Sequence, residues 1–393
     1  MKFLKKLFPK RRSVVFYRQS YYHFYYLAQA LRKRGWDAVV VNLEPVDGAN
    51  ANFYHGEDIN LYDSNPVIFQ QNINHFFQYA QARFQLMHFA GDGYLSFYPE
   101  YAFIEEPPDI LAWKKLHKKI AYSISGCNSG TSQTMVSQWS IADNGLNVCD
   151  RCVWQDHTEV CANEKNLDWG AKVHKYCDLI FSETLPALDY MKPGNKVIRE
   201  PTTMCLDPDF WSPDLHIPDE HCVKKETGEV LIYHAVGNYN FRNTQTKNIK
   251  GTPFVFAAVE RLQEEGYPVR LIFITDQPNQ VVRYYQAQSD IIVDQLNYGR
   301  YGANAREGMM LGKPVICYLN KYEFREEDKL ACLAECPLVS ASEKTIYDEL
   351  KNLVVNAALR KTIGAQSRQY ALKWHAADAC AERYERIYDQ LFS

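Results

Sequence analysis

In the first half of the chain, apolar residues follow a strand-like pattern in some segments and a helix-like pattern in others. Short apolar runs typical of buried strands recur there, and the segment between the first two runs carries apolar residues at helical spacing. The predicted strands are Ser13–Arg18, Asp37–Leu43, Gln85–Phe89, Lys119–Ser125, Leu179–Ser182 and Lys196–Arg199. The predicted helix spans about 22–34, with Gly35 as its cap. A strand–helix–strand opening of this kind predicts a parallel α/β domain.

The second half of the chain shows the same alternation. Its predicted strands are Glu229–Ala235, Val269–Thr275 and Asp290–Leu296, and its predicted helices lie at about 252–265, 279–288, 343–356 and from about 358 onward. Residues 290–318 indicate a strand, a glycine-containing turn, a short helix, a Gly-Lys-Pro turn and a strand. Two such halves predict a pair of doubly wound, Rossmann-like α/β domains that face each other across a cleft.

The expected domain boundaries follow from these patterns and from a link rich in Pro and Asp between the halves. The expected segments are a basic N-terminal segment 1–12, a first Rossmann-like domain 13–205, an interdomain link 206–228, a second Rossmann-like domain 229–375 and a C-terminal helix 376–393 that returns to the first domain. A cysteine-containing insertion is expected in the first domain at about 127–165.

Composition narrows the classes of function. The chain has 393 residues, of which 46% are hydrophobic and 23% charged, and this suits two domains with cores of their own. The formal net charge of −3 argues against a nucleic-acid partner. No G-x-G-x-x-G follows the first strand and no P-loop motif is present, so we expect neither a redox cofactor nor P-loop phosphoryl transfer.

The N-terminus is basic and only weakly apolar. It lacks an apolar stretch long enough for a signal peptide or a transmembrane helix, which predicts a cytoplasmic protein. Its cations are Lys2, Lys5, Lys6, Lys10, Arg11 and Arg12, which surround Phe3, Leu4, Leu7 and Phe8. Two interpretations stay open: a peripheral anchor on the anionic cytoplasmic membrane face, and a solvated chain end.

The helix predicted after Asp290–Leu296 has features of an anion site. Gly302 falls where this helix begins, and a helix start offers free backbone N–H groups and the positive end of the helix dipole to a phosphate. Glu307 follows about one turn later and is suited to accept hydrogen bonds from sugar hydroxyls. Together they indicate a nucleoside diphosphate with its ribose on Glu307. The alternative is an ordinary strand–helix–strand unit with a surface glutamate.

The same segment resembles a known family. It runs Glu307-Gly308-Met309-Met310-Leu311-Gly312-Lys313-Pro314-Val315, and it is similar to the signature Glu-Ala-Met-Ala-x-Gly-x-Pro-Val of the large retaining GT-B glycosyltransferase family. This family is also described as glycosyltransferase family 4-like, or glycosyl transferases group 1, and includes bacterial polysaccharide and glycolipid transferases. Its members carry another Glu eight positions earlier that typically contacts the donor hexose. Here that position is Gly299, so the identity of the sugar is open.

The loop 237–252 supplies cations next to a predicted helix start. Cations and free N–H groups are what a departing diphosphate needs, and Arg242, Lys247 and Lys250 lie in this loop. In the resembling family a Lys before Gly contacts the donor phosphates at this place, and Lys250-Gly251 matches it. The alternative is a solvated basic loop.

The resemblance implies a division of labour between the domains. A nucleoside diphosphate sugar would bind to the second domain and the acceptor to the first. The implied donor-binding residues are Arg242, Lys247, Lys250, Gly299, Tyr301, Gly302, Ala303, Asn304 and Glu307. Lys250 would also be catalytic, and no catalytic divalent metal is required if cations and N–H groups stabilise the charge of the leaving group.

The first domain offers two further catalytic candidates, His88 and Asp92. They lie at the carboxyl end of a predicted strand, where α/β sheets place ligand loops, and the resembling family has His-containing loops near the reacting sugar. His88 could equally be a core histidine, and Asp92 a turn residue beside two glycines. A second position, where the family has His before Gly, is here Ser125-Gly126.

Four of the eleven cysteines form a candidate metal site. Cys149 and Cys152 have the C-x-x-C spacing of zinc sites, and Cys127 and Cys161 could complete a tetrahedral set that would be structural because it leaves no open position. His157 is a substitute ligand. Unliganded thiols and a redox pair are the alternatives.

The function expected from these features is glycosyl transfer. A sugar would pass from a nucleoside diphosphate sugar to a saccharide or lipid-linked acceptor, with retention, in bacterial cell-surface polysaccharide or glycoconjugate synthesis. Two alternatives belong to other classes: a catalytically silent nucleotide-sugar-binding protein, and an epimerase or phosphorylase of the same fold.

Overall fold

The computed structural model describes residues 12–18, 21–48, 56–91, 95–124, 126–127, 130–182, 196–199, 205–244, 246–321 and 331–392. The chain divides into two compact units: unit 1 contains Met1–Gln133, Cys161–Cys205 and Ala377–Ser393, and unit 2 contains Thr134–Val160 and Leu206–Ala376. Asp92, Ser125 and residues 1–11 lie outside the described residues.

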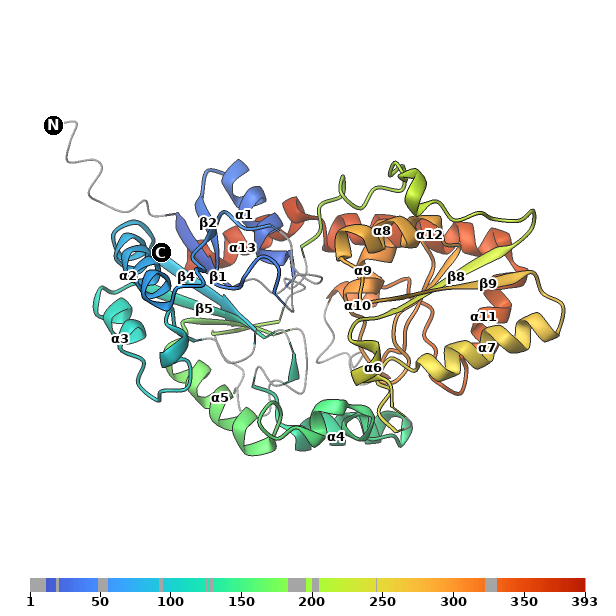
Figure 1. The fold of residues 1–393 in the computed structure, drawn as a ribbon, viewed down its shortest axis with the longest axis horizontal. Helices are drawn as coiled ribbons and strands as arrows, with labels where there is room; N and C mark the ends of the chain where they lie inside the picture. Colours follow the sequence, from blue (N-terminus) through green and yellow to red (C-terminus); the bar gives the residue numbers. More distant parts are fainter. Residues whose placement is uncertain are drawn as a thin grey trace. The chain divides into compact units, whose positions relative to one another are not determined.

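Unit 1 is built on a parallel sheet with strand order β3-β2-β1-β4-β5-β6-β7. Figure 1 labels β1, β2, β4 and β5 of this sheet. The strands are β1 (Ser13–Tyr17), β2 (Asp37–Asn42), β3 (Ile59–Asn60), β4 (Leu86–Ala90), β5 (Lys119–Ser123), β6 (Leu179–Phe181) and β7 (Val197–Ile198). Each pairs in parallel with its neighbours, and the short apolar runs of the sequence correspond to β1, β2 and β4–β7. Continuous apolar runs arise because both faces of a parallel sheet are covered.

The helices of unit 1 cover the two faces of this sheet. One face carries α2 (Pro66–Arg83), α3 (Pro108–Lys115) and α5 (Asn163–Tyr176), whose apolar residues share a core with Val15 and Tyr17 of β1. On the other face α1 (His23–Lys33) packs against α13 (Ala377–Gln390), and Phe16 of β1 contacts Phe24 of α1. Neighbouring residues of β1 therefore face opposite layers, as strand geometry requires. A short helix, η2 (Pro99–Tyr101), precedes α3.

Ion pairs fasten the C-terminal helix α13 within unit 1. Arg12 approaches Glu385 and Asp389 at 2.7 Å each, and Arg34 approaches Glu385 at 2.6 Å. One of the six cations of the basic N-terminal segment is thus engaged with the protein's own carboxylates.

Unit 2 has a second parallel sheet, with strand order β11-β10-β8-β9. Its strands are β8 (Val230–Val236), β9 (Val269–Thr275), β10 (Ile291–Val293) and β11 (Val315–Ile316), and Val339 forms a bridge with Ile316. The helices α7 (Thr252–Glu264) and α11 (Ile346–Val355) bury their apolar sides in one core with β8 and β10. The helix α9 (Ala303–Met310) contacts both α8 (Asn279–Gln288) and α12 (Ala357–Trp374). Other short helices of unit 2 are α6 (Tyr239–Arg242), η7 (Asp219–His221) and α10 (Ala331–Ala334).

The segment Thr134–Val160 belongs to unit 2, although the sequence analysis places it in the first domain. It contains most of α4 (Gln133–Asn144) together with η4 (Val148–Arg151) and η5 (Val153–Asp156). Arg151 lies 3.2 Å from Glu343, and Asp143 accepts a hydrogen bond from the hydroxyl of Tyr318. These contacts join residues far apart in the chain, which is why local sequence patterns do not predict them.

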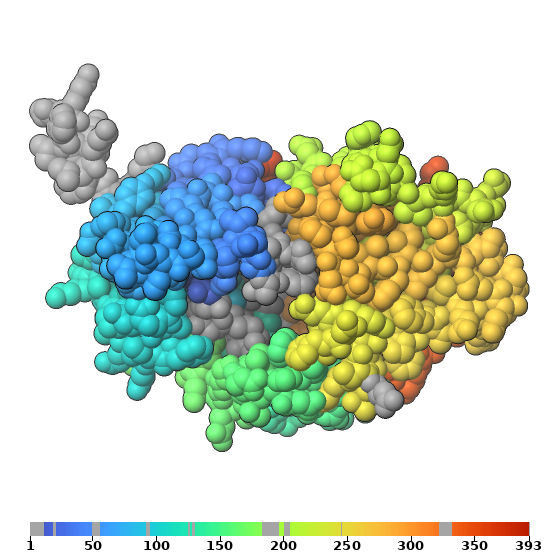
Figure 2. Space-filling view, in the orientation of Figure 1, coloured from blue at the N-terminus to red at the C-terminus, as the bar shows by residue number. Residues whose placement is uncertain are grey.

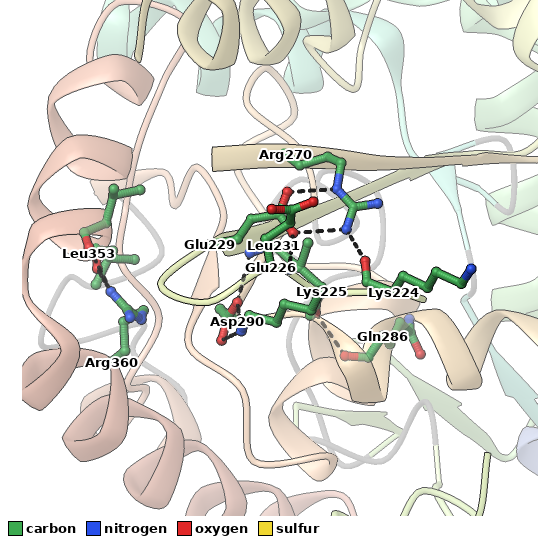
Figure 3. Close-up of polar contacts among 12 residues, drawn as sticks. Lys224, Lys225, Glu226, Glu229, Leu231, Arg270, Gln286, Asp290, Leu353 and Arg360 are labelled. Carbon is green, nitrogen blue, oxygen red and sulfur yellow. Dashed lines mark hydrogen bonds and ion pairs between the residues drawn. The ribbon is translucent and has the colours of Figure 1, made fainter. Parts of the chain in front are cut away.

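Polar contacts organise the amino ends of the unit 2 strands (Figure 3). Arg270 of β9 contacts both carboxylate oxygens of Glu229, at 2.8 and 2.9 Å, and Lys225 lies 2.6 Å from Asp290. Asp290 also accepts the backbone N–H of Leu231 at 2.7 Å. The network lies at the opposite strand ends from the candidate site described below, so we interpret it as structural.

Among the described residues, no helix combines the length and the apolar character that crossing a membrane requires.

Candidate functional site

The order of the unit 2 strands singles out one place in the sheet. The chain passes from β8 to β9 on one side and then to β10 on the other side of β8. Open α/β sheets bind ligands outside the carboxyl ends of the strands where the strand order reverses in this way. The loop 237–251 and the loop 294–302 leave the sheet there, and each leads into a helix, α7 and α9 respectively.

Asp294 joins these two loops. Its carboxylate is completely buried, and it contacts the Lys250 Nζ at 2.6 Å and accepts the backbone N–H of Gly302 at 2.7 Å. The backbone N–H of Leu296 also donates to the Lys250 carbonyl, at 3.2 Å. A buried carboxylate needs such a charged partner and such donors to offset its desolvation. Asp294 therefore fixes Lys250 relative to the start of α9, and the sequence analysis missed it.

Two glycines allow this close approach. Gly251 has φ +74°, and a Cβ on it would lie 2.7 Å from the Cβ of Leu296, so both its conformation and its lack of a side chain are required. Gly302 caps α9, and a Cβ there would lie 3.2 Å from Asp294 Oδ2. Beyond Gly302 the first N–H groups of α9 have no partner within the helix, as at any helix start. This end of α9 can therefore donate to an anion.

His234 of β8 stabilises the place where the loops 237–251 and 294–302 meet. It is fully buried in β8, and its two ring nitrogens lie 2.9 Å from the Val293 carbonyl and 2.9 Å from the Thr252 hydroxyl. Burial lowers the pKa of His234 to about 4, so the ring is neutral at pH 7. It then donates to Val293 and accepts from Thr252, which ties the start of α7 to β8 and β10. From the sequence, this position was only part of an apolar strand, and the role of His234 was not predicted.

Glu307 lies inside the unit and not on its surface. Only 4% of it is exposed, and its Oε2 accepts a hydrogen bond of 2.8 Å from the Gln286 side chain of α8. The same amide group reaches Asn304 Oδ1 at 3.2 Å, so Asn304 and Glu307 face α8 together. Burial and then the nearby charges of Glu307 and Asp294 raise the pKa of Tyr233. The surface-glutamate alternative is therefore wrong.

The three cations of the loop 237–251 have different surroundings. Lys250 pairs with Asp294 and keeps 14% of its side chain exposed. Lys247 lies 2.9 Å from Gln155 Oε1 and 3.3 Å from Asp156 Oδ1, and 13% of its side chain is exposed. Its charge thus holds η5 to the loop, and its assignment as a donor-binding residue stays a prediction. Arg242, at the end of α6, is half-buried and has no ionic partner among the described side chains.

Gly299 stands where the resembling family has its first Glu, and the structure shows why a side chain is excluded. Its φ is +97°, and a Cβ on it would lie 2.8 Å from Cη2 of Trp139 and 3.0 Å from the Cβ of Asn320. The Asn320 amide in turn donates to the Trp139 carbonyl at 3.0 Å. The indole of α4 therefore closes this position, so Gly299 can contact a ligand only through its backbone.

Tyr301 takes part in a contact with α12. Its hydroxyl lies 2.9 Å from that of Tyr370 and 3.4 Å from His375 Nε2. Its ring lies under the guanidinium of Arg306, 4.9 Å from the ring centroid. These contacts fix the turn before α9. The Tyr301 hydroxyl therefore faces α12, and the assignment of Tyr301 to donor binding stays a prediction.

His88 of unit 1 is a core residue. It is completely buried, its Nε2 lies 2.8 Å from the Ser123 hydroxyl, and its Nδ1 forms a hydrogen bond with Tyr388 of α13. Burial, and secondarily the neighbouring His23, holds the pKa of His88 well below its usual range. A neutral ring with both nitrogens engaged cannot reach a substrate, which corrects its assignment as catalytic and favours the core alternative.

The cysteine cluster gains no support as a metal site. Cys127 and Cys161 belong to unit 1 and Cys149 and Cys152 to unit 2. All four are half-buried thiols. Across the residues that the structure describes, no group of three or more His, Cys, Asp or Glu side chains could hold a metal ion. A structural zinc stays a prediction from the C-x-x-C spacing, which elemental analysis can test.

Comparison with known proteins places the fold. No protein-family model matches the chain, and no curated protein matches it in sequence. A glycosyltransferase from Rickettsia africae matches with a TM-score of 0.57 at 11% identity, over 97% of this chain and 98% of its own. Anabaena HepE in complex with UDP and glucose matches with 0.53 at 10% identity, over 96% and 100%. The UDP-GlcNAc 2-epimerase from Neisseria meningitidis bound to UDP-GlcNAc matches with 0.50 at 12% identity, over 96% and 99%.

These likenesses define the class of the fold. The chain has the GT-B architecture of two Rossmann-like units, each with a parallel sheet covered by helices, and the predicted fold is confirmed. At these identities the likeness establishes the fold, whereas the function must come from the site.

Proposed function

We propose that the chain is a glycosyltransferase that binds the diphosphate of a nucleotide sugar where the loops 237–251 and 294–302 of unit 2 meet. The sugar passes to a saccharide or lipid-linked acceptor, with retention, in bacterial cell-surface polysaccharide or glycoconjugate synthesis. The observation that supports the proposal best is the buried Asp294, which holds a lysine beside the start of a helix. The fold adds support because HepE was solved with UDP and glucose.

The proposed mechanism rests on charge stabilisation. When the bond between sugar and diphosphate breaks, negative charge grows on the leaving oxygen. Lys250 and the first N–H groups of α9 are already oriented by Asp294, so little reorganisation is needed as that charge appears. Arg242 is a second cation for the diphosphate. With this set of donors a catalytic divalent metal is not required.

Glu307 is proposed to accept the ribose hydroxyls. Its second-turn position in α9 and its bond to Gln286 keep the carboxylate in one orientation. The interaction requires the ribose hydroxyls to join or replace the contacts of this carboxylate, of which the hydrogen bond from Gln286 to Oε2 is one.

Calorimetry with UDP and GDP tests the binding step, and release of free nucleotide from UDP-glucose, UDP-galactose, UDP-GlcNAc and GDP-mannose tests the chemistry. Lys250→Ala should slow turnover by about 10² to 10³ because it removes a donor to the transition state. The matched control is Lys344→Ala, an exposed lysine of the same unit. The proposal would be contradicted if neither nucleotide binds, or if turnover falls equally in Lys250→Ala and Lys344→Ala.

One alternative within the fold has its own readout. Because a UDP-GlcNAc 2-epimerase shares the architecture, NMR of incubations with UDP-GlcNAc distinguishes the two activities. Inversion at C2 with the nucleotide still attached indicates an epimerase. Free UDP together with a glycosylated acceptor indicates a transferase. Nucleotide binding without either product indicates a silent binding protein.

A further inference from the structure

The segment Thr134–Val160 builds part of the surface next to the loop 237–251. In Figure 2 the green surface of this segment and the yellow surface of the loop lie side by side. Gln155 and Asp156 of η5 hold the Lys247 ammonium of that loop. Backbone hydrogen bonds from Gln155 to Cys152 and from His157 to Trp154, each 3.2 Å, order η5 itself. The two segments therefore form one local surface.

Three aromatic rings meet at this contact and form what we call the aromatic platform: Trp154, His157 and Phe241. The Phe241 centroid lies 5.1 Å from Trp154 and 5.3 Å from His157, and the other two centroids are 5.9 Å apart. Although the rings pack on one another, Trp154 remains 37% exposed and Phe241 40% exposed. The His157 side chain remains 39% exposed.

Exposed carboxylates lie beside the platform. His157 Nδ1 lies 3.1 Å from Glu159, whose side chain is 70% exposed, and Asp156, with 61% of its side chain exposed, precedes His157 in the chain. Exposed aromatic rings with hydrogen-bond acceptors beside them are typical of a binding site.

We propose that the aromatic platform binds a pyranose ring of the acceptor saccharide. A pyranose has an apolar face of C–H groups and an edge of hydroxyls, so it matches the exposed face of an aromatic ring with carboxylates beside it. This inference rests on the proposed function, because it assigns the platform to the acceptor of the proposed reaction. It also places acceptor contacts on unit 2, whereas the sequence analysis places the acceptor on the first domain alone.

The exposure of the platform favours the acceptor over the donor sugar. An activated sugar has to be protected from water, and the groups proposed to hold its diphosphate are buried: Asp294 completely, and Lys250 with 14% of its side chain exposed. The platform rings are more than twice as exposed as Lys250, and this suits a longer saccharide that continues into solvent.

The test uses the full chain and affinity electrophoresis in native gels containing dextran, mannan, hydroxyethylcellulose or polygalacturonic acid. At least one polysaccharide should retard the wild type. Trp154→Ala and Phe241→Ala should each weaken that retardation by about tenfold, since each removes a stacking ring. Trp154→Phe should keep most of it. The matched control is Phe103→Ala, which removes a 75% exposed phenylalanine from unit 1 and should change nothing.

Calorimetry with UDP on the same proteins separates this inference from the proposed function. Normal UDP binding with lost retardation in Trp154→Ala supports the platform. Retardation that is absent in the wild type, or equal in the wild type and both platform variants, overturns it even if UDP binds normally. Loss of UDP binding in the wild type instead contradicts the proposed function. If circular dichroism shows that Trp154→Ala is unfolded, the other two variants decide the test. The inference then requires that Trp154→Phe is still retarded by the polysaccharide and that Phe241→Ala is not.

Discussion

The ion pair between Asp294 and Lys250 allows a quantitative test of the site's architecture. Asp294 is completely buried and its carboxylate lies 2.6 Å from the lysine Nζ. Removing one member of a buried pair leaves the other uncompensated and typically costs about 3–5 kcal/mol. Because 14% of the lysine side chain is exposed, its charge can partly regain water, and the lower end of that range is expected for Asp294→Asn.

The test is a double-mutant cycle measured by urea unfolding. Asp294→Asn and Lys250→Met should each destabilise unit 2, by about 3 kcal/mol and about 2 kcal/mol respectively. The double variant carries no unpaired charge, so it should be more stable than the sum of the single losses predicts, by about 1.5–3 kcal/mol. Asp294→Ala should destabilise unit 2 by about 1 kcal/mol more than Asp294→Asn does, because it also removes the acceptor for the Gly302 N–H.

A second ion pair of nearly equal length provides the control. Lys373 and Glu335 approach to 2.7 Å, but their side chains are 57% and 49% exposed. Exposed pairs contribute about 0–1 kcal/mol, so the coupling in that cycle should be small. If the Asp294–Lys250 cycle is additive, or no larger than this control, the carboxylate does not hold the lysine in the folded protein and the junction described here is wrong.

Three further predictions concern other parts of the chain. Gly299→Glu should lower the melting temperature and should not create a donor contact, because Trp139 occupies the space beside Gly299; a stable variant with tighter UDP-sugar binding would contradict this. Hydrogen bonds from Arg270 are the main reason why the pKa of Glu229 is lowered to about 2. Their contact therefore stabilises the fold fully above the unfolded pKa of 4.5, and this stabilisation is lost as the pH falls towards 2. Arg270→Gln should therefore reduce the melting temperature at pH 7 but much less near pH 2.5, and a pH-independent difference would refute the assignment. Deletion of residues 2–11 should abolish co-sedimentation with anionic liposomes at low salt, since each cation near such a surface contributes about 1 kcal/mol; equal sedimentation of both forms would leave the segment as a solvated chain end.

The architecture could be predicted from local sequence patterns because the strands of parallel sheets leave a local signal. Their strands are buried on both faces, so they stand out as apolar runs, and β1, β2, β8 and β9 lie within a residue of the predicted runs. The glycine and periodicity signals around α9 are equally local. The Lys250-Gly251 pair and the Gly302 helix start were identified for the same reason, since they depend on residues adjacent in the chain.

The contacts that those residues make depend on the three-dimensional fold. Asp294 is 44 positions from Lys250, and Lys247 is 92 positions from Gln155, so no periodicity connects them. His88 resembled a catalytic residue from its position at a strand end, yet Tyr388, 300 residues later, shares its hydrogen bond in the core. Chain neighbours set the propensity for helix and strand, whereas the burial and charge of a side chain depend on whatever the fold brings against it. The fold was therefore predictable, whereas the partners of its polar groups were not.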